Sequence, residues 1–435
     1  MLRVEPTRIL PLSTSGDRIP VVGGIPHPSP WSPAIRLLVD RGHAVTWRPG
    51  AVAAALVSRA AGLRAYTLWP SAAHPRIAAD LGHPASAAWL RLTFEPDAPR
   101  RLVGPATWNA LRTHGLVLGP PSRLIAEAIR RGADRDIAAP RLALYSPTGQ
   151  SLSKAACFVF EDGAEQPTLV VKAMPDPRYA SRLRHETEMV ETIRRRLGWS
   201  SHLAAALPLP PLFAGTGAGE YVVVQPVDPL AASTGRLADP APALSWLREF
   251  QDSTTTRIRA WGDVDTEDAL EHVRYAWCRA RPAIAAAVIA DAERLLRTLE
   301  GRPVRRCAVH GDFWRGNIAY RRSNSSDRNG QLRIYDWEWA QPEGTPFFDL
   351  WTTELGVLRR QAEEGEPELT QPARDALARV ASELERQSLD PGFARATLAP
   401  SLGWLVFRVR RLTGVAGGAE AASVRLMAAV ESLLS

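Results

Sequence analysis

Two short strings of the sequence concentrate side chains suited to phosphoryl transfer. VHGDFWRGNI spans residues 309–318, and IYDWEWAQPEGTPFFDLW spans residues 334–351. Together they supply the carboxylates of Asp312 and Asp336 and the amide of Asn317. A carboxylate can orient or deprotonate an acceptor hydroxyl, and oxygen ligands can hold Mg²⁺ against the phosphates of a nucleotide. These residue types therefore predict a magnesium-dependent phosphoryl transfer.

The positions of the three residues predict a hairpin that brings them together. Asp312 and Asn317 lie five residues apart around a tight loop, and Asp336 ends an apolar strand. The polar turn SNSSDRNG separates that strand from the one that leaves Asn317. Turn-forming residues between two short apolar runs are typical of a hairpin.

Both strings, in this order, resemble the aminoglycoside phosphotransferase and choline kinase superfamily. Its pattern is an HGD-x4-N loop, an apolar strand and D-[WF]-[ED], often followed by G-x4-D. The matching residues are His310, Gly311, Asp312, Asn317, Asp336, Trp337, Glu338, Gly344 and Asp349. The resemblance implies a bilobal protein-kinase-like α+β fold, with a small antiparallel sheet in the N-lobe and a mainly helical C-lobe. It also implies ATP or GTP as the co-substrate.

The resemblance assigns roles to individual residues. Asp312 becomes the catalytic base or hydroxyl-orienting group, and Asn317 and Asp336 become ligands of Mg²⁺. Lys172 holds the α- and β-phosphates. Its ion-pair partner comes from the following helix, where Glu186 is the first choice and Glu188 the alternative.

Further residues are expected around the nucleotide. The loop from Gly149 to Lys154 occupies the position of the phosphate-covering loop, so Ser151, Ser153 and Lys154 are nucleotide-binding candidates. Family members often carry Gly and Asn where this chain has Ser151 and Lys154. Lys154 therefore either touches phosphate or faces solvent. The chain contains only two lysines, Lys154 and Lys172, which points to a specific need for a compact ammonium in this segment.

Four supporting residues flank the catalytic loop and the metal motif: His310, Arg315, Glu338 and Asp349. We expect His310 to hydrogen-bond the backbone and Asp349 to brace the loop. Arg315 either neutralises the γ-phosphate or is solvated, and Glu338 either contacts a second metal or lies behind the ligands. Among the nearby tryptophans, Trp314 and Trp339 are the better candidates for a wall of the acceptor site.

The chain divides into three predicted parts. Residues 1–135 form a small α/β extension of unknown role, with strands in 43–48 and 63–69, and helices in 51–61, 74–83 and 120–132. Residues 136–228 are the N-lobe: two strands, a strand containing Lys172, a helix, and the strand 220–227, which ends in proline and suits a sheet edge. Residues 229–435 are the helical C-lobe. Its segments 245–285 and 350–410 are expected to line the acceptor pocket.

Composition favours a globular protein of the cytoplasm. With 45% hydrophobic and 23% charged residues, the chain of 435 residues can bury more than one core. The three cysteines are too few for a disulfide framework, and no stretch is apolar enough to span a bilayer. The net charge is +7, and the basic excess lies towards the N-terminus without an arginine cluster interleaved with aromatics, so nucleic acid is a minor possibility. The oligomeric state is not determined by these features.

Three functions fit this pattern. The first is a kinase that phosphorylates a hydroxyl of a small metabolite or natural product. The second is a kinase of peptide Ser or Thr in a biosynthetic pathway, with residues 1–135 recruiting the peptide. The third, a nucleotide-binding pseudokinase, is disfavoured because Asp312, Asn317, Asp336 and Lys172 are all present.

Overall fold

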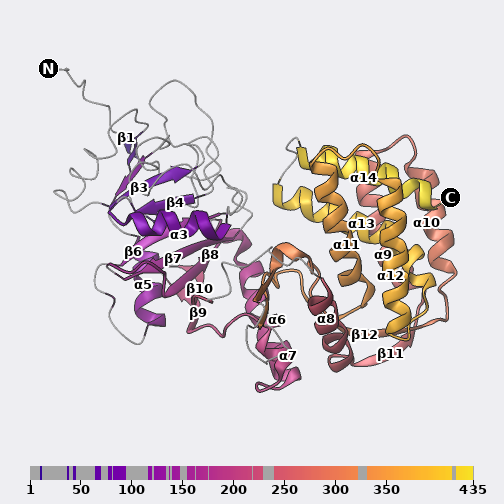
Figure 1. The fold of residues 1–435 in the computed structure, drawn as a ribbon, viewed down its shortest axis with the longest axis horizontal. Helices are drawn as coiled ribbons and strands as arrows, with labels where there is room; N and C mark the ends of the chain where they lie inside the picture. Colours follow the sequence, from indigo (N-terminus) through magenta and orange to yellow (C-terminus); the bar gives the residue numbers. More distant parts are fainter. Residues whose placement is uncertain are drawn as a thin grey trace. The chain divides into compact units, whose positions relative to one another are not determined.

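The chain forms two compact units, each described here by itself. One unit comprises Met1–His185 and Leu209–Ala232, and the other comprises Glu186–Pro208 and Ser233–Ser435 (Figure 1). The computed structural model describes residues 10–11, 37–38, 43–45, 64–69, 77–80, 82–94, 116–119, 122–133, 137, 140–146, 154–161, 163–174, 176–217, 219–228, 240–321, 331–413 and 418–434.

The first unit is built on one antiparallel sheet. Its ten strands run in the order β1 (Leu10–Pro11), β2 (His43–Val45), β5 (Leu116–Gly119), β3 (Arg64–Trp69), β4 (Ile77–Asp80), β6 (Arg141–Tyr145), β7 (Ala155–Phe160), β8 (Leu169–Ala173), β10 (Glu220–Pro226) and β9 (Phe213–Gly217). Strand β4 of the predicted extension pairs directly with β6 of the predicted N-lobe. The two segments therefore share a sheet, and the functional boundary at residue 135 stays a prediction.

Two helices pack against this sheet on opposite faces. Side chains alternate along a strand: Leu142 and Leu144 of β6 belong to the core cluster that includes α5 (Arg123–Gly132), whereas Ala143 belongs to the cluster under α3 (Pro84–Phe94). Ser122 caps the N-terminus of α5, and its hydroxyl accepts a hydrogen bond from the N–H of Ile125. The helix predicted over 120–132 is thus confirmed.

Lys172 lies in β8, in the interior of the sheet. It is in register with Ala156 of β7 and Val223 of β10, and it is half-buried. After β8, a short 3₁₀ turn, Pro177–Tyr179, leads into helix α6 (Ala180–Leu197), as the sequence predicts.

Two predictions for this unit are wrong. The strand 220–227 is not an edge, because β10 lies between β8 and β9; Pro226 is the last residue of β10, where a missing N–H costs the ladder little. Residues 77–80 are a strand and not part of a helix, since all four are buried between β3 and β6. Pairing on both sides outweighs the helix propensity of the alanines. The helix predicted over 51–61 lies outside the described residues.

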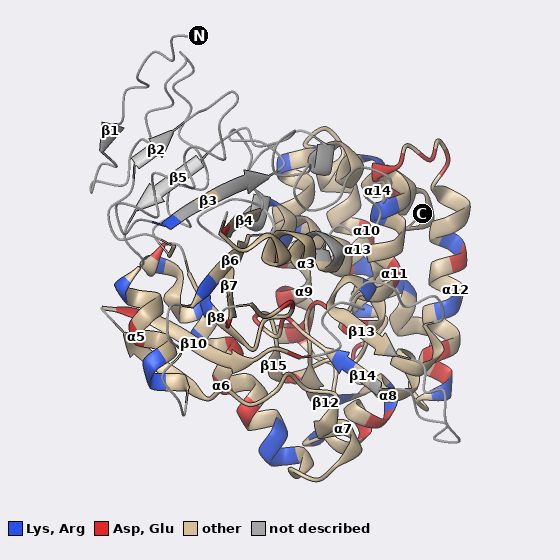
Figure 2. Ribbon diagram, turned by 60° about the vertical axis from the view of Figure 1, so that its left-hand side comes forward, with Lys and Arg blue, Asp and Glu red and all other residues tan. Residues whose placement is uncertain are grey.

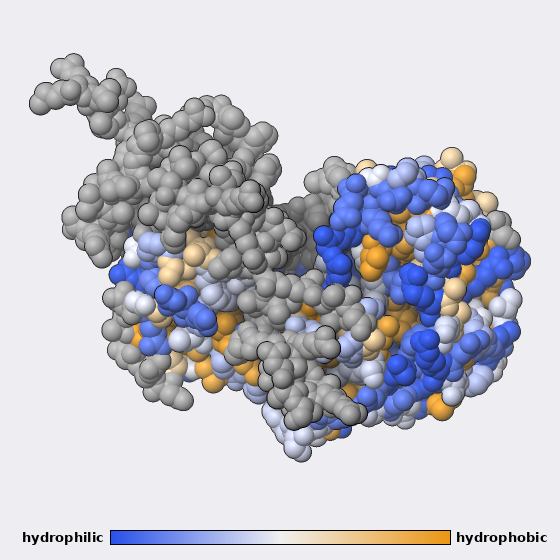
Figure 3. All heavy atoms as spheres, viewed as in Figure 1, coloured by the Kyte–Doolittle hydropathy of each residue, from blue (hydrophilic) through white to orange (hydrophobic). Residues whose placement is uncertain are grey.

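The second unit is mainly helical, which confirms the predicted mixed α/β architecture with a helical C-terminal part. Its helices are α7 (His202–Ala205), α8 (Ala241–Ser253), α9 (Asp263–Ala280), α10 (Ala285–Arg297), α11 (Phe347–Glu363), α12 (Thr370–Arg386), α13 (Gly392–Thr413) and α14 (Gly418–Leu434). The core contains fully buried Trp277, Trp337 and Trp351. Acidic and basic residues alternate along α12 (Figure 2), and the visible face of the unit is mostly hydrophilic (Figure 3). No helix among the described residues is long and apolar enough to cross a membrane.

Short strands position the candidate catalytic residues within this unit. Strand β12 (Pro303–Val309) pairs with β11 (Arg257–Ala260) and β15 (Gln341–Gly344). Strands β13 (Ile318–Arg321) and β14 (Gln331–Ile334) form the predicted antiparallel pair, with Ile318 opposite Ile334. The hairpin prediction is confirmed.

Helices α9 and α13 approach each other closely at Gly403. A Cβ atom added there would lie 2.4 Å from the carbonyl oxygen of His272 and 3.0 Å from the N atom of Val273. Because these are backbone atoms, they cannot rotate away as the end of a side chain could. Gly403 therefore fixes how deeply and in which register α13 packs on α9.

We expect Gly403→Ala to lower the free energy of unfolding by about 2 kcal/mol through overpacking. The gain in helix propensity, up to about 1 kcal/mol, is too small to offset this loss. Gly217→Ala is the control, since its added Cβ meets only ordinary contacts of 3.8 Å or more. Urea unfolding of both variants measures the difference, and equal stability would contradict the close approach.

Candidate functional site

The candidate catalytic loop, residues 310–317, follows β12 through a turn that requires glycine. Gly311 has a φ of +75°, and a Cβ atom there would lie 2.3 Å from the carbonyl oxygen of Trp339. Both the backbone conformation and the close approach exclude a larger residue. The loop is thereby pressed against the segment that follows Asp336.

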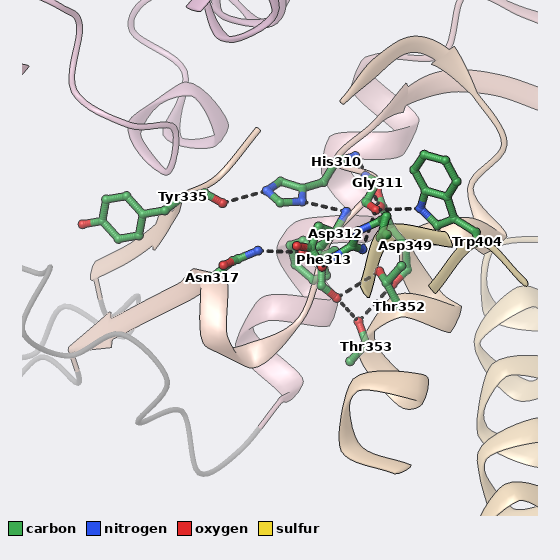
Figure 4. A network of polar contacts seen from close by, with 11 residues as sticks. His310, Gly311, Asp312, Phe313, Asn317, Tyr335, Asp349, Thr352, Thr353 and Trp404 are labelled. Carbon is green, nitrogen blue, oxygen red and sulfur yellow. Dashed lines mark hydrogen bonds and ion pairs between the residues drawn. The ribbon is translucent and has the colours of Figure 1, made fainter. Parts of the chain in front are cut away.

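Asp349, in the first turn of α11, binds the start of this loop (Figure 4). Its carboxylate accepts hydrogen bonds from the N–H groups of His310 and Gly311, both at 2.8 Å. The side chain is fully buried, and burial raises its pKa to about 7 while the two N–H donors oppose the rise. The positive end of the α11 dipole also favours a carboxylate at this position.

His310 connects the loop to the metal motif through its ring. The N–H of Asp312 donates to Nδ1 at 3.1 Å, so Nδ1 is the acceptor and Nε2 carries the proton. Nε2 then donates to the carbonyl oxygen of Tyr335 at 2.9 Å (Figure 4). Burial lowers the pKa of His310 to about 4, and the imidazole is therefore neutral at pH 7. These bonds give His310 a structural contact with the backbone on each side of the site.

Asp312 is buried beside an arginine that the sequence analysis did not single out. Its side chain is 10% exposed, and its Oδ1 lies 2.5 Å from Nη2 of Arg408 in α13. Burial raises the pKa of Asp312 to about 6; Arg408 opposes this rise, and the charge of Asp336 adds to it. The arrangement holds a carboxylate with raised basicity in a protected position.

Asn317 and Asp336 are brought to this carboxylate by the hairpin. The side-chain Nδ2 of Asn317 donates to the carbonyl oxygen of Asp312 at 3.0 Å, and the N–H of Tyr335 donates to the carbonyl oxygen of Asn317 at 2.8 Å. Asp336 follows with a φ of 69°, in the left-handed region that a non-glycine residue rarely adopts. Such conformations persist at functional sites where the surroundings enforce them.

The donor set of this hairpin fits Mg²⁺. Mg²⁺ commonly uses one or two protein oxygens and completes its shell with phosphates and water. The carboxylate of Asp336 and the side-chain oxygen of Asn317 match that number. The charge of Asp336 also raises the pKa of Asp312, a repulsion that a divalent cation relieves.

The remaining predicted residues are distributed over both units. Glu186 of α6 is buried, whereas Glu188 is exposed. Lys172 is half-buried in β8, and Lys154 precedes β7. Arg315 and Glu338 are half-buried, the former in the 3₁₀ turn Arg315–Asn317. Ser151 and Ser153 lie outside the described residues. Within the second unit, Asp312, Asn317, Asp336, His310 and Asp349 meet at one site.

Half-buried aromatic side chains lie next to the catalytic loop. Trp339 packs edge-on against Trp404, with ring centroids 5.3 Å apart, and Trp404 stacks on Phe407 and meets His272 edge-on. Trp404 also donates from Nε1 to the carbonyl oxygen of Gly311 at 3.1 Å (Figure 4). The segments 245–285 and 350–410 both contribute to this aromatic cluster. Trp314 instead packs beside Gly356, and the guanidinium of Arg359 lies over its ring, 5.5 Å from the centroid.

The sequence analysis missed Arg408 and Trp404, which contact the catalytic loop directly. They are four residues apart and therefore share one face of α13. The available signal was this spacing within WLVFRVRR, but Arg408, Arg410 and Arg411 are indistinguishable by residue type. Only the packing of α13 selects Arg408.

Solved structures that resemble this chain are named as kinases or phosphotransferases. A macrolide 2′-phosphotransferase type I shares 14% sequence identity with a TM-score of 0.40, covering 71% of this chain and 95% of that chain. A choline/ethanolamine kinase family protein from Mesorhizobium loti shares 12% with a TM-score of 0.40, covering 72% and 95%. A glucosamine kinase in complex with glucosamine, ADP and inorganic phosphate shares 17% with a TM-score of 0.39, covering 70% and 84%. No protein-family model and no curated protein matches the chain.

The buried His310 predicts a pH-dependent stability. Its pKa is about 4 in the folded chain against 6.5 for an ordinary histidine, so below pH 6.5 the unfolded chain binds a proton that the folded chain excludes. The free energy of unfolding should therefore fall by about 2 kcal/mol from this residue between pH 7 and pH 5. Urea unfolding of the wild type and His310→Asn across this range isolates the contribution. Identical pH slopes would show that His310 is not buried in the neutral form.

Proposed function

We propose that this chain is a phosphotransferase of the aminoglycoside phosphotransferase and choline kinase superfamily, which moves the γ-phosphoryl group of ATP or GTP to a hydroxyl of a small molecule. The observation that carries the proposal is the meeting of Asp312, Asn317 and Asp336 on one loop and one hairpin, with Asp312 buried and paired to Arg408. Phosphoryl transfer needs a positioned carboxylate next to oxygen ligands for a cation, and this arrangement supplies both.

In the proposed reaction, the phosphoryl group moves to the acceptor oxygen and the acceptor proton moves to Asp312. The acceptor oxygen forms a bond to the γ-phosphorus while the bond between that phosphorus and the β,γ-bridging oxygen breaks. The nucleoside diphosphate leaves, and the hydroxyl proton passes to the Asp312 carboxylate. A pKa of about 6 leaves Asp312 mostly ionised at pH 7 and more basic than an ordinary aspartate, as a general base requires.

Asn317 and Asp336 would hold Mg²⁺, which supplies positive charge against the phosphate oxygens. The chain's own contribution is to fix these two ligands. The 2.8 Å bond from the N–H of Tyr335 to the carbonyl of Asn317 ties the ligand-bearing loop to the strand that leads to Asp336. His310 adds a second tie, because its ring joins the N–H of Asp312 to the carbonyl of the same Tyr335.

The nucleotide side of the proposal uses Lys172, with Glu186 as its partner. Lys172 occupies the interior of a sheet between two paired strands, an unusual place for an ammonium without a specific partner or ligand. Glu186 is buried in α6, and the exposed Glu188 is the weaker candidate.

The three cysteines are free, which fits the proposed cytoplasmic location.

The acceptor side favours a small molecule over an extended peptide. An aromatic cluster lies beside the catalytic loop, and its member Trp404 donates a hydrogen bond to the carbonyl oxygen of Gly311. The other members are Trp339, Phe407, His272 and Tyr275. Aromatic rings of this kind bind compact ligands through their faces and edges.

A screen with labelled ATP and GTP against sugars, amino alcohols, aminoglycosides, macrolides, aromatic alcohols and Ser/Thr peptides tests the acceptor class. Binding of either nucleotide without any dependence on Mg²⁺ would contradict the proposed kinase.

We predict that Asp312→Ala lowers kcat by at least ~10²-fold, the usual scale for the loss of a general base. Nucleotide affinity should stay nearly unchanged, because Asp312 acts on the acceptor. The rate of transfer of labelled γ-phosphate measures the first effect, and titration with nucleotide measures the second. Full activity in this variant would remove Asp312 from the proposed role.

The two lysines offer a matched comparison on the nucleotide side. Lys172→Ala should raise KM for the nucleotide and lower kcat/KM by at least ~10-fold, since a charge-assisted bond to phosphate is lost. Lys154→Ala removes the same charge from the residue before β7 and should have a smaller effect. Steady-state kinetics with ATP and GTP give both values. Equal effects of the two substitutions would show that Lys172 does not bind the phosphates.

A further inference from the structure

Arg408 makes an unusual set of contacts with the catalytic loop. Its Nη1 donates to the carbonyl oxygen of Gly311 at 3.1 Å, and its Nη2 lies 2.5 Å from Oδ1 of Asp312. The guanidinium also lies 5.8 Å from the ring centroid of Trp339. Arg408 is only 5% exposed, and its Nε has no hydrogen-bond partner among the described residues.

We propose that Arg408 is a positioning residue for phosphoryl transfer, which holds the carboxylate of Asp312 in its reactive orientation from a helix remote in sequence. The inference rests on the proposed function. It adds a residue that lies outside both sequence motifs and 96 positions beyond Asp312, by subtraction of the two residue numbers.

The contacts argue against a merely structural role. The carbonyl of Gly311 already accepts a hydrogen bond from Trp404 of the same helix, so α13 is attached to the loop without Arg408. Burying a guanidinium is costly unless its charge is compensated, and the compensating group here is the candidate catalytic carboxylate. A neutral residue would fill the same space at lower cost if packing alone were required.

The geometry also explains why arginine is used. The planar fork presents two N–H groups at a fixed separation, and here they bridge the backbone carbonyl of Gly311 and the carboxylate of the next residue, Asp312. One oxygen of Asp312 is thereby fixed relative to the backbone of Gly311, which is itself held by Asp349 at 2.8 Å. A lysine offers a point charge without this fork.

The test compares Arg408→Met and Arg408→Lys with the control Arg395→Met. Arg395 lies in the same helix, and its side chain donates hydrogen bonds to the backbone carbonyls of Leu433 and Leu434. With MgATP or MgGTP and the acceptor from the screen, or water, we expect kcat to fall by at least ~10-fold in Arg408→Met and by less in Arg408→Lys. The KM for the nucleotide and the activity of Arg395→Met should stay within about twofold of the wild type.

A double-mutant cycle with Asp312→Asn separates positioning from general damage. If Arg408 acts through the carboxylate, Arg408→Met should cost less than about threefold in kcat once Asp312 is Asn, because coupled residues are not additive. Equal losses in both backgrounds would overturn the inference. If Arg408→Met does not fold, Arg408→Lys decides: a kcat equal to that of the wild type would overturn it.

The outcome for the proposed function is distinguishable. A wild type that transfers no phosphoryl group overturns the function and the inference together. A wild type that is active, with Arg408→Met and Arg408→Lys equally active, overturns only the role of Arg408.

Discussion

The carboxylate of Asp349 is the fixed point around which the catalytic loop is arranged. It is fully buried at the first turn of α11 and accepts the N–H groups of two successive loop residues, His310 and Gly311. Without it, two buried donors would lack partners, at a cost of about 1–3 kcal/mol each. Because α11 is part of the hydrophobic core, this contact transfers the rigidity of the core to the loop.

From that point the geometry follows in steps. Gly311 turns against the carbonyl of Trp339, and His310 links the loop to the carbonyl of Tyr335. The pairing of β13 with β14 then places Asn317, just before β13, close to Asp336, which follows β14. The site is thus held by hydrogen bonds from the side chains of Asp349, His310 and Asn317 to the loop backbone, together with close backbone contacts.

Charge balance is the second constraint on this site. Asp312, Asp336 and Asp349 bring three carboxylates close together, and burial makes the ionised forms of Asp312 and Asp349 costly. Arg408 compensates part of that charge at Asp312, and two N–H donors compensate part at Asp349. The charge of Asp336 raises the pKa of Asp312, and a cation bound at the proposed Mg²⁺ position would reduce this repulsion.

Local sequence was sufficient to predict the loop of residues 310–317, the hairpin that follows, and the helical character of the second unit. Such features depend on neighbours in the chain, on turn residues and on apolar periodicity. The alanine-rich residues 77–80 became a strand because β3 and β6 pair with them, which local propensity does not report.

The contacts of Arg408 and Trp404 with the catalytic loop depend on tertiary packing. Their position depends on the register of α13 on α9, and that register is set where Gly403 lets two backbones touch. Three arginines within four residues look alike in the sequence. Which of them contacts the loop depends on packing between helices more than a hundred residues apart in the chain, and the local sequence does not indicate this packing.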